Sequence, residues 1–139
     1  MKLSVKSDYA ARAVLELSRA HPGGEVVRVE DLARLHGIPP NYLVQILIAL
    51  KARGLVKSVR GKDGGYLLAR PPAQISLGDV LRSIHGAVFD TPALEDGNCP
   101  RELHRAWKGL RTAVESAADA VNFQQLVEEG AEKERMFYI

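Results

Sequence analysis

The sequence has very little cysteine and no long apolar run. One cysteine stands among 139 residues, so no disulfide can form within the chain, and this predicts a reducing, cytoplasmic location. No segment approaches the roughly 18 consecutive apolar residues that a membrane span requires. The opening, MKLSVKSDYAARAV, lacks the apolar core of a secretory signal. We therefore expect a cytoplasmic protein that does not associate with membranes.

The residue patterns of catalysis are also missing. No phosphate-binding glycine loop and no nucleophile–base pair is present, and the four histidines fall in different predicted elements. The charged fraction of 26% and the apolar fraction of 46% are ordinary for a globular domain of this length. We therefore expect one domain, or one domain with an appended helix, and no enzymatic activity.

Charge is divided unevenly along the chain. Residues 1–72 carry twelve Lys and Arg against six Asp and Glu, whereas residues 73–139 carry seven against eleven. The overall net charge of +2 hides this contrast. A basic half of this kind is typical of a surface that faces a polyanion.

The segment from Ile38 to Arg70 has the pattern of a helix followed by a basic hairpin. Pro39-Pro40 suits a helix start, and Gly54 suits the left-handed residue that ends one. Two β-prone runs, 55–59 and 65–69, then flank a glycine-containing turn. Between Lys51 and Arg70 there are six basic residues and one acid. The predicted helix has one apolar face, made by Leu43, Ile46, Leu47 and Leu50.

Two further helices precede this segment. Ser7 or Asp8 can cap the first, and Gly37 ends the second, with a short strand possible over residues 26–29. Two short helices joined by a glycine-containing turn have helix-turn-helix spacing. The predicted fold is therefore mainly α with a small β-hairpin wing: a winged helix-turn-helix followed by a long C-terminal dimerisation helix.

In this geometry the second helix of the pair enters the major groove of double-stranded DNA. Asn41 and Gln45 can make bidentate bonds to adenine, and Val44 can contact a thymine methyl group. Tyr42 either contacts a phosphate through its hydroxyl or packs half-buried under the helix. The wing tip would supply a minor-groove contact and a phosphate contact. The predicted DNA-binding residues are Asn41, Tyr42, Val44, Gln45, Lys51, Lys57, Arg60 and Lys62.

The C-terminal half predicts a dimer interface. Ser76 to Asp79 resembles a capping box that opens a helix, and the irregular stretch 87–100 follows it. A long helix is then expected from about Arg101 to Val121, with apolar residues repeating every four and three positions, as at the interface of a coiled coil. The alternative is packing within one chain. The predicted interface residues are Leu103, Trp107, Leu110, Val114, Ala117 and Val121.

These features divide the chain into three parts. Residues 1–72 form the predicted winged helix-turn-helix region, and residues 73–100 form a linking helix and a sensor loop. Residues 101–139 hold the predicted dimerisation helix, a short terminal helix and a charged tail, whose apolar end could dock on a partner or on the dimer.

Four stretches resemble one family of regulators: MKLSVKSDYAARAVLELS, LARLHGIPPNYL, GLVKSVRGKDGGYLLARP and ISLGDVLRSIHG. They are similar to the IscR/NsrR/CymR-type bacterial transcription factors, the Rrf2 family. The resemblance implies a homodimeric winged-helix regulator, usually a repressor, that dimerises through the long helix after the sensor loop. It also implies that the predicted helix residues face the major groove and that Arg60 serves the wing.

Many members of this family hold an iron–sulfur cluster with three cysteines in the loop that corresponds to residues 87–100. This chain has Cys99 alone, so a three-cysteine site is excluded. The resemblance leaves open a 2Fe–2S cluster with unusual ligands, for which Asp8, His36 and Cys99 are candidates, completed by Asp90, His85 or His104. The alternative roles are a helix cap for Asp8, a surface residue for His36 and a lone thiol for Cys99.

Other signals remain open as well. Cys99 could act as a redox-sensing thiol, and a small molecule or a protein partner could act as the effector. A different class of function is a protein-interaction module, in which the winged-helix scaffold no longer binds DNA and the acidic half binds a partner. Retention on heparin or on random duplex DNA distinguishes this module from a DNA-binding regulator.

Overall fold

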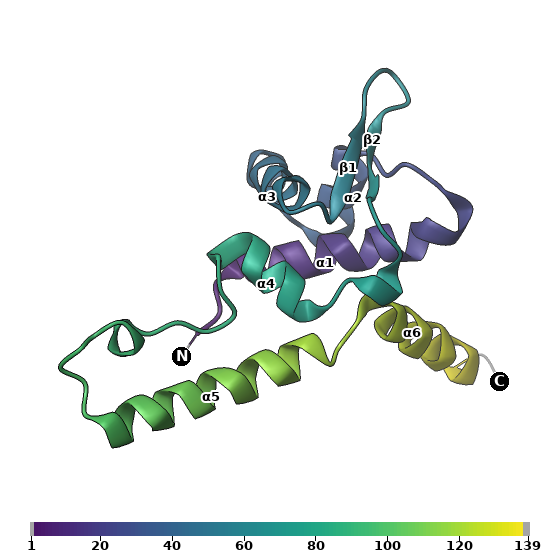
Figure 1. Cartoon of the computed structure of the whole chain (residues 1–139). Helices are drawn as coiled ribbons and strands as arrows, with labels where there is room; N and C mark the ends of the chain where they lie inside the picture. Colours follow the sequence, from purple (N-terminus) through teal and green to yellow (C-terminus); the bar gives the residue numbers. More distant parts are fainter. Residues whose placement is uncertain (1, 138–139) are drawn as a thin grey trace.

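The computed structural model describes residues 2–137 and confirms a mainly helical fold with a small β-hairpin (Figure 1). No helix in these residues is both long and apolar enough to cross a bilayer. In chain order the elements are α1 (Val5–Ala20), η1 (His21–Gly23), α2 (Val29–His36), α3 (Pro40–Ala52), β1 (Val56–Val59), β2 (Gly65–Leu68), η2 (Pro72–Gln74), α4 (Leu77–His85), η3 (Pro92–Leu94), α5 (Arg101–Asp119) and α6 (Phe123–Phe137).

Helix α1 lies at the centre of the core. It contacts α2, α3, α4, α6 and the strand β2, so most of the fold is built against it. Its small residues Ala10 and Ala13 are fully buried and allow the neighbouring helices to approach closely. The predicted apolar face of α3 is also confirmed, since each of its four members has no exposed surface: Leu43, Ile46, Leu47 and Leu50.

The wing is an antiparallel hairpin in which Val56 pairs with Leu68 and Val59 with Gly65. The strand expected over residues 26–29 is reduced to one bridge, because α2 already begins at Val29. In this bridge the backbones of Val27 and Tyr66 exchange two hydrogen bonds of 2.8 Å. A Cβ atom on Gly65 would lie 2.3 Å from the Val27 carbonyl oxygen, so this close approach requires glycine.

Helices α4 and α5 form the side of the molecule opposite the wing (Figure 1). The predicted capping box is confirmed at the start of α4: Ser76 Oγ accepts from the Asp79 N–H, and the Asp79 carboxylate accepts from the Ser76 N–H. A small apolar cluster joins Leu81 of α4 to Val88 and Ala118, with Val114 packed against it. Beyond this cluster α5 extends away from the body of the protein (Figure 1).

Three expected boundaries were wrong. Ser4 caps α1 through a hydrogen bond from the Ser7 N–H, whereas Ser7 is buried and Asp8 is exposed within the first turn. Helix α5 ends at Asp119, so Val121 lies beyond it. The expected short terminal helix and charged tail form one continuous helix, α6, because its Glu, Ala, Lys and Arg residues favour helix and outweigh the single glycine. Residues 138–139 lie outside the described part of the chain.

Candidate nucleic-acid interface

The outward face of α3 carries the predicted groove-facing side chains. Asn41, Val44 and Gln45 are exposed, as expected for the side of the helix opposite its buried face. Ile48 lies on the same outward face and is also exposed, but sequence reasoning missed it. The signal was present, because Ile48 follows Val44 by four positions and interrupts the spacing of the buried residues. We call Asn41, Val44, Gln45 and Ile48 the outer α3 face.

Tyr42 departs from this arrangement. Its ring is half-buried against the core and packs edge-on to Tyr9 of α1, with 5.9 Å between ring centroids and an interplanar angle of 84°. Of the two roles open for Tyr42, the structure thus places the ring in packing between α1 and α3. Edge-to-face pairs of this kind favour a fixed helix-to-helix geometry. Tyr42 therefore holds α3 on α1, whatever its hydroxyl contacts.

The end of α3 is tied to the wing. Lys51 Nζ donates a 2.8 Å hydrogen bond to Ser58 Oγ on β1, so α3 and the hairpin share a polar contact. Lys57, Arg60 and Lys62 are exposed, and within residues 2–137 none of the three makes a side-chain hydrogen bond or ion pair. Their charges are consequently available to an external anion. The four basic residues predicted to bind DNA thus all lie on α3 or on the wing that follows it.

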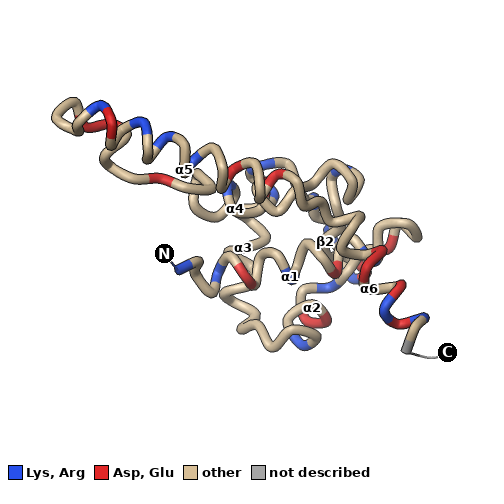
Figure 2. Tube along the Cα trace, turned by 90° about the horizontal axis from the view of Figure 1, so that it is seen from below, with Lys and Arg blue, Asp and Glu red and all other residues tan. Residues whose placement is uncertain are grey.

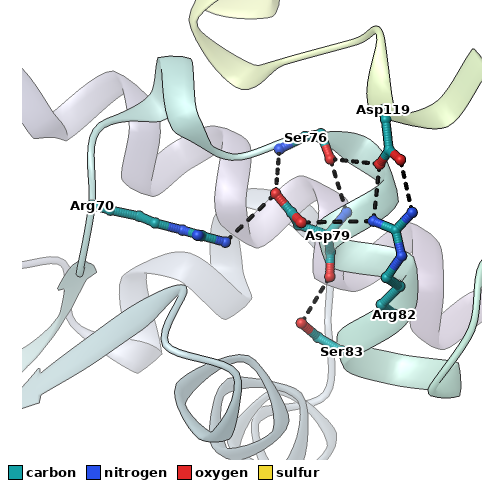
Figure 3. A network of polar contacts seen from close by, with 6 residues as sticks. All are labelled: Arg70, Ser76, Asp79, Arg82, Ser83 and Asp119. Atoms are coloured by element: carbon teal, nitrogen blue, oxygen red, sulfur yellow. Dashed lines mark hydrogen bonds and ion pairs between the residues drawn. The ribbon is translucent and has the colours of Figure 1, made fainter. Parts of the chain in front are cut away.

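A polar network connects the base of the wing to α4 and α5 (Figure 3). The Asp79 carboxylate lies between Arg70, 3.5 Å away at the end of the wing, and Arg82, 3.7 Å away on its own helix. Arg82 in turn donates two hydrogen bonds to Asp119, the last residue of α5. Those hydrogen bonds lower the pKa of Asp119 and raise the pKa of Arg82. This network fixes the wing, α4 and α5 to one another through side chains that lie far apart in sequence.

The structure separates the candidate cluster ligands. Asp8 makes a 3.0 Å ion pair with Arg12 on the surface of α1. His36 Nε2 lies 3.1 Å from Glu16 Oε1, so it joins the end of α2 to α1. Glu16 also forms an ion pair with Arg19, so Asp8 and Glu16 each already have an arginine partner. Asp8 therefore pairs along the surface of α1 and His36 joins α2 to α1, and within residues 2–137 neither belongs to a group of side chains placed to hold a metal ion.

Cys99 and His104 do lie together. They line a shallow hollow of about 340 Å³ at the start of α5, in which His104 Nε2 is 3.3 Å from the Leu94 carbonyl oxygen. Within residues 2–137, however, no group of three His, Cys, Asp or Glu side chains is placed to hold a metal ion. A cluster needs four ligands, normally thiolates, and one chain offers a single thiol. The residues present do not fit an iron–sulfur cluster held by one chain. The hollow is lined by Leu94, Glu95, Asp96, Gly97, Cys99, Arg101 and His104.

The apolar face predicted on α5 is divided. Near the C-terminal end, Val114 packs on the cluster with α4, so this part is used within the chain. Leu103 and Leu110, within the first ten residues of α5, are 46% and 45% exposed. Basic and acidic residues both occur along α5 and along α6 (Figure 2). The exposed leucines thus form an uncovered apolar face on α5. The remaining predicted interface residues are half-buried Trp107 and Val121 and exposed Ala117.

Comparison with known proteins places these features in a family. Residues 3–129 match the sequence profile of Rrf2, described as an iron-dependent transcriptional regulator. The chain is 41% identical over 124 residues to a candidate HTH-type transcriptional regulator of Mycobacterium tuberculosis, covering 86% of this chain and 76% of that protein. It is 34% identical over 142 residues to the HTH-type transcriptional regulator CymR of Bacillus subtilis, covering the whole of both chains.

Solved structures agree with this assignment. The structure of B. subtilis CymR, described as the global cysteine regulator, superposes with a TM-score of 0.80 at 30% identity and covers 93% of this chain and 98% of its own. The structure of IscR from T. potens gives a TM-score of 0.77 at 29% identity and covers 96% and 90%. The helix-turn-helix and wing therefore belong to a fold that transcriptional regulators share.

Proposed function

Because this chain belongs to the Rrf2 family of DNA-binding transcriptional regulators, which are not enzymes, we propose that it binds operator DNA as a homodimer, with the outer α3 face in the major groove and the wing on the neighbouring backbone. One observation carries this proposal. Residues 38–62 contain five Lys and Arg and no Asp or Glu, and all five basic side chains are exposed. Such a surface neutralises phosphates, with Asp63 beside Lys62 as the one acid on the wing.

The individual roles follow from position. Asn41 and Gln45 lie toward the start of α3, the end that enters the groove first, and their amides can bond adenine. Arg60 and Lys62 at the wing tip bind phosphate or the minor groove. Lys51 and Lys57 flank the junction of helix and wing and contact the backbone. Tyr42 sets the angle of α3 through its contact with Tyr9 and adds a phosphate contact through its hydroxyl.

The exposed leucines of α5 support a homodimer. Two copies packed through Leu103 and Leu110 would bury apolar side chains that one copy leaves in water. A two-fold dimer also presents two recognition helices to half-sites spaced about one DNA turn apart, roughly 34–36 Å. We propose a repressor of this form, with its signal entering through the loop between α4 and α5, which contains Cys99.

Salt-dependent binding tests the DNA assignment. We would measure duplex affinity by fluorescence anisotropy between 50 and 200 mM salt for the native protein and for Arg60→Ala/Lys62→Ala. The double variant should bind at least tenfold more weakly, and the slope of log affinity against log salt should fall by about one to two, as expected for two lost phosphate contacts. The matched control, Lys133→Ala/Arg135→Ala, removes two exposed charges from α6 and should change neither quantity.

The competing function makes a different prediction. A protein-interaction module would show no retention on heparin and no salt-dependent duplex binding at all. Duplex binding that is unaffected by loss of Arg60 and Lys62 would remove the wing from the proposed interface. Binding that both double variants weaken equally would indicate attraction by overall charge and not by α3 and its wing.

A further inference from the structure

Two branched apolar side chains lie side by side in solvent on the outer α3 face. Val44 and Ile48 are four positions apart, and they are 39% and 57% exposed. Neither is among the buried residues of the core or the half-buried residues packed against it, whereas the four apolar residues of the opposite face are fully buried. Their exposed parts leave apolar surface in water. An external partner with apolar groups would account for them.

The residues around Val44 and Ile48 indicate which kind of partner fits this face. Lys51 follows Ile48 by one helical turn and is bonded to Ser58 on the wing, and Arg60 and Lys62 extend the positive charge along the hairpin. Between residues 38 and 63 one acid, Asp63, stands against five basic residues. An apolar protein surface gains nothing from such a cationic border. A polyanion that has apolar groups on the floor of a groove complements both the positive charges and the apolar side chains. The DNA major groove is such a surface, and its apolar group is the C5-methyl of thymine.

We propose that Val44 and Ile48 contact thymine methyl groups and so set the base preference of this regulator. This inference rests on the proposed function, since it names the bases that the outer α3 face contacts. Residues four apart on a helix are separated by about 6 Å along its axis, close to two base-pair steps of about 3.4 Å. The two contacted thymines therefore fall within three consecutive base pairs of each half-site. Asn41 and Gln45 on the same face can bond adenine, so both kinds of side chain favour A·T pairs.

Deoxyuridine provides the test, because it removes the C5-methyl and leaves the hydrogen-bonding edge and the phosphates unchanged. The full-length protein would first select its preferred duplex from a random pool. Each thymine of that duplex is then replaced singly by deoxyuridine, and affinity is measured at one fixed salt concentration. We expect a loss of about fourfold per methyl at two positions within three base pairs of each half-site, the factor that corresponds to burying one carbon-sized apolar group. Other positions should show no loss.

Variants connect each methyl to a side chain. Val44→Ala and Ile48→Ala should each weaken binding to the thymine duplex by about fourfold. Each should also abolish the deoxyuridine effect at one of the two positions and preserve it at the other. Because both side chains are exposed, neither change disturbs the core. The control is Val59→Ala, which trims an exposed apolar side chain on the wing and should leave both deoxyuridine effects intact.

The outcomes of these experiments distinguish a failure of the thymine-contact inference from a failure of the proposed DNA-binding function. Specific duplex binding that no deoxyuridine replacement weakens would overturn the thymine contact and leave the regulator assignment standing. Deoxyuridine effects that persist in both variants would assign the methyl contacts to other residues and overturn the inference as well. If Val44→Ala and Ile48→Ala reduce self-association of DNA-free protein and spare DNA binding, a second copy covers this face. If no duplex is selected and none binds, the proposed function itself fails.

Discussion

The Arg82 guanidinium bonds both carboxylate oxygens of Asp119, with N–O distances of 2.9 Å and 2.8 Å, and so joins α4 to the last residue of α5 (Figure 3). Asp119 also accepts a 3.2 Å hydrogen bond from Ser76 Oγ at the start of α4. A Cβ atom on Gly78 would lie 2.1 Å from Asp119 Oδ1, so the first turn of α4 admits this carboxylate because residue 78 is glycine. The long helix is thus fixed to the helix that follows the wing.

Asp119→Asn should destabilise the protein by about 1 kcal/mol at neutral pH, since it removes the charge from a bidentate pair whose carboxylate is 44% exposed and partly screened by solvent. The hydrogen bonds from Arg82 hold the pKa of Asp119 below its ordinary value. The folded state therefore binds this proton less readily than the unfolded state. The contribution is complete above the ordinary aspartate pKa of about 4 and is lost as the pH falls through the lower pKa of the folded protein.

Urea unfolding at a series of pH values between 7 and 3 measures this contribution. The difference in unfolding free energy between native protein and Asp119→Asn should narrow as the pH falls below about 4. Asp63→Asn, at an exposed site on the wing without an ion pair in the described residues, should match the native protein at pH 7. A difference that stays constant down to pH 3 would show that the carboxylate charge contributes nothing to stability through Arg82.

The close approach of Gly65 to the Val27 backbone leaves no room for a side chain at position 65. Gly65→Ala would place a Cβ atom 2.3 Å from the Val27 carbonyl oxygen, and a backbone atom cannot move aside as a side chain can. We expect a loss of about 2 kcal/mol in unfolding free energy, typical of overpacking, together with weaker duplex binding as the wing shifts. Urea denaturation and fluorescence anisotropy measure the two effects.

Gly97→Ala supplies the comparison, because nothing lies within 4 Å of a Cβ atom at that position. It should leave stability and duplex binding unchanged. Equal effects of the two changes would mean that the bridge between Val27 and Tyr66 does not position the wing.

Local sequence patterns predicted α3 and its hairpin well. The spacing of Leu43, Ile46, Leu47 and Leu50 is a periodic signal within one helix, and glycines with concentrated basic charge mark the turn beside it. The capping box at Ser76 was equally readable, because both partners lie within one turn. The recognition helix and wing could therefore be expected from neighbouring residues alone.

Contacts between distant residues could not be expected in the same way. Arg82 and Asp119 are 37 positions apart, and Glu16 and His36 are 20 apart, so no spacing rule connects them. The cap of α1 was misplaced because Ser4, Ser7 and Asp8 all suit that role, and burial of Ser7 decides the matter only in the folded protein. The candidate cluster ligands failed to assemble for a related reason: His36 contacts Glu16 on another helix, and no spacing rule connects Asp8 or His36 to Cys99.

The possible metal ligands around Cys99 lead to a prediction about the iron content of the purified protein. Protein purified without oxygen should be colourless and should lack stoichiometric iron and sulfide, because one chain supplies a single thiolate and no grouped ligands in its described part. Treatment with an iron chelator should then leave duplex affinity unchanged. An absorption spectrum with iron and sulfide assays provides the measurement. A visible band with about two irons per subunit would contradict this expectation, and Cys99→Ala and His36→Ala would then identify the ligands.

The uncovered half of α5 gives a prediction on assembly. Leu110→Glu introduces a charge where two apolar faces would meet, so it should convert a dimer to a monomer at micromolar concentration while each chain stays folded, since Leu110 is exposed within one copy. Thr112→Glu adds the same charge on the opposite, exposed side of α5 and should leave the dimer intact. Sedimentation velocity distinguishes the two states.

The monomeric variant should also bind a two-half-site duplex far more weakly than the native protein, because one recognition helix loses the effective concentration that the second provides. A dimer that survives Leu110→Glu together with Leu103→Glu would place the interface elsewhere and leave the long helix to its contacts with α4.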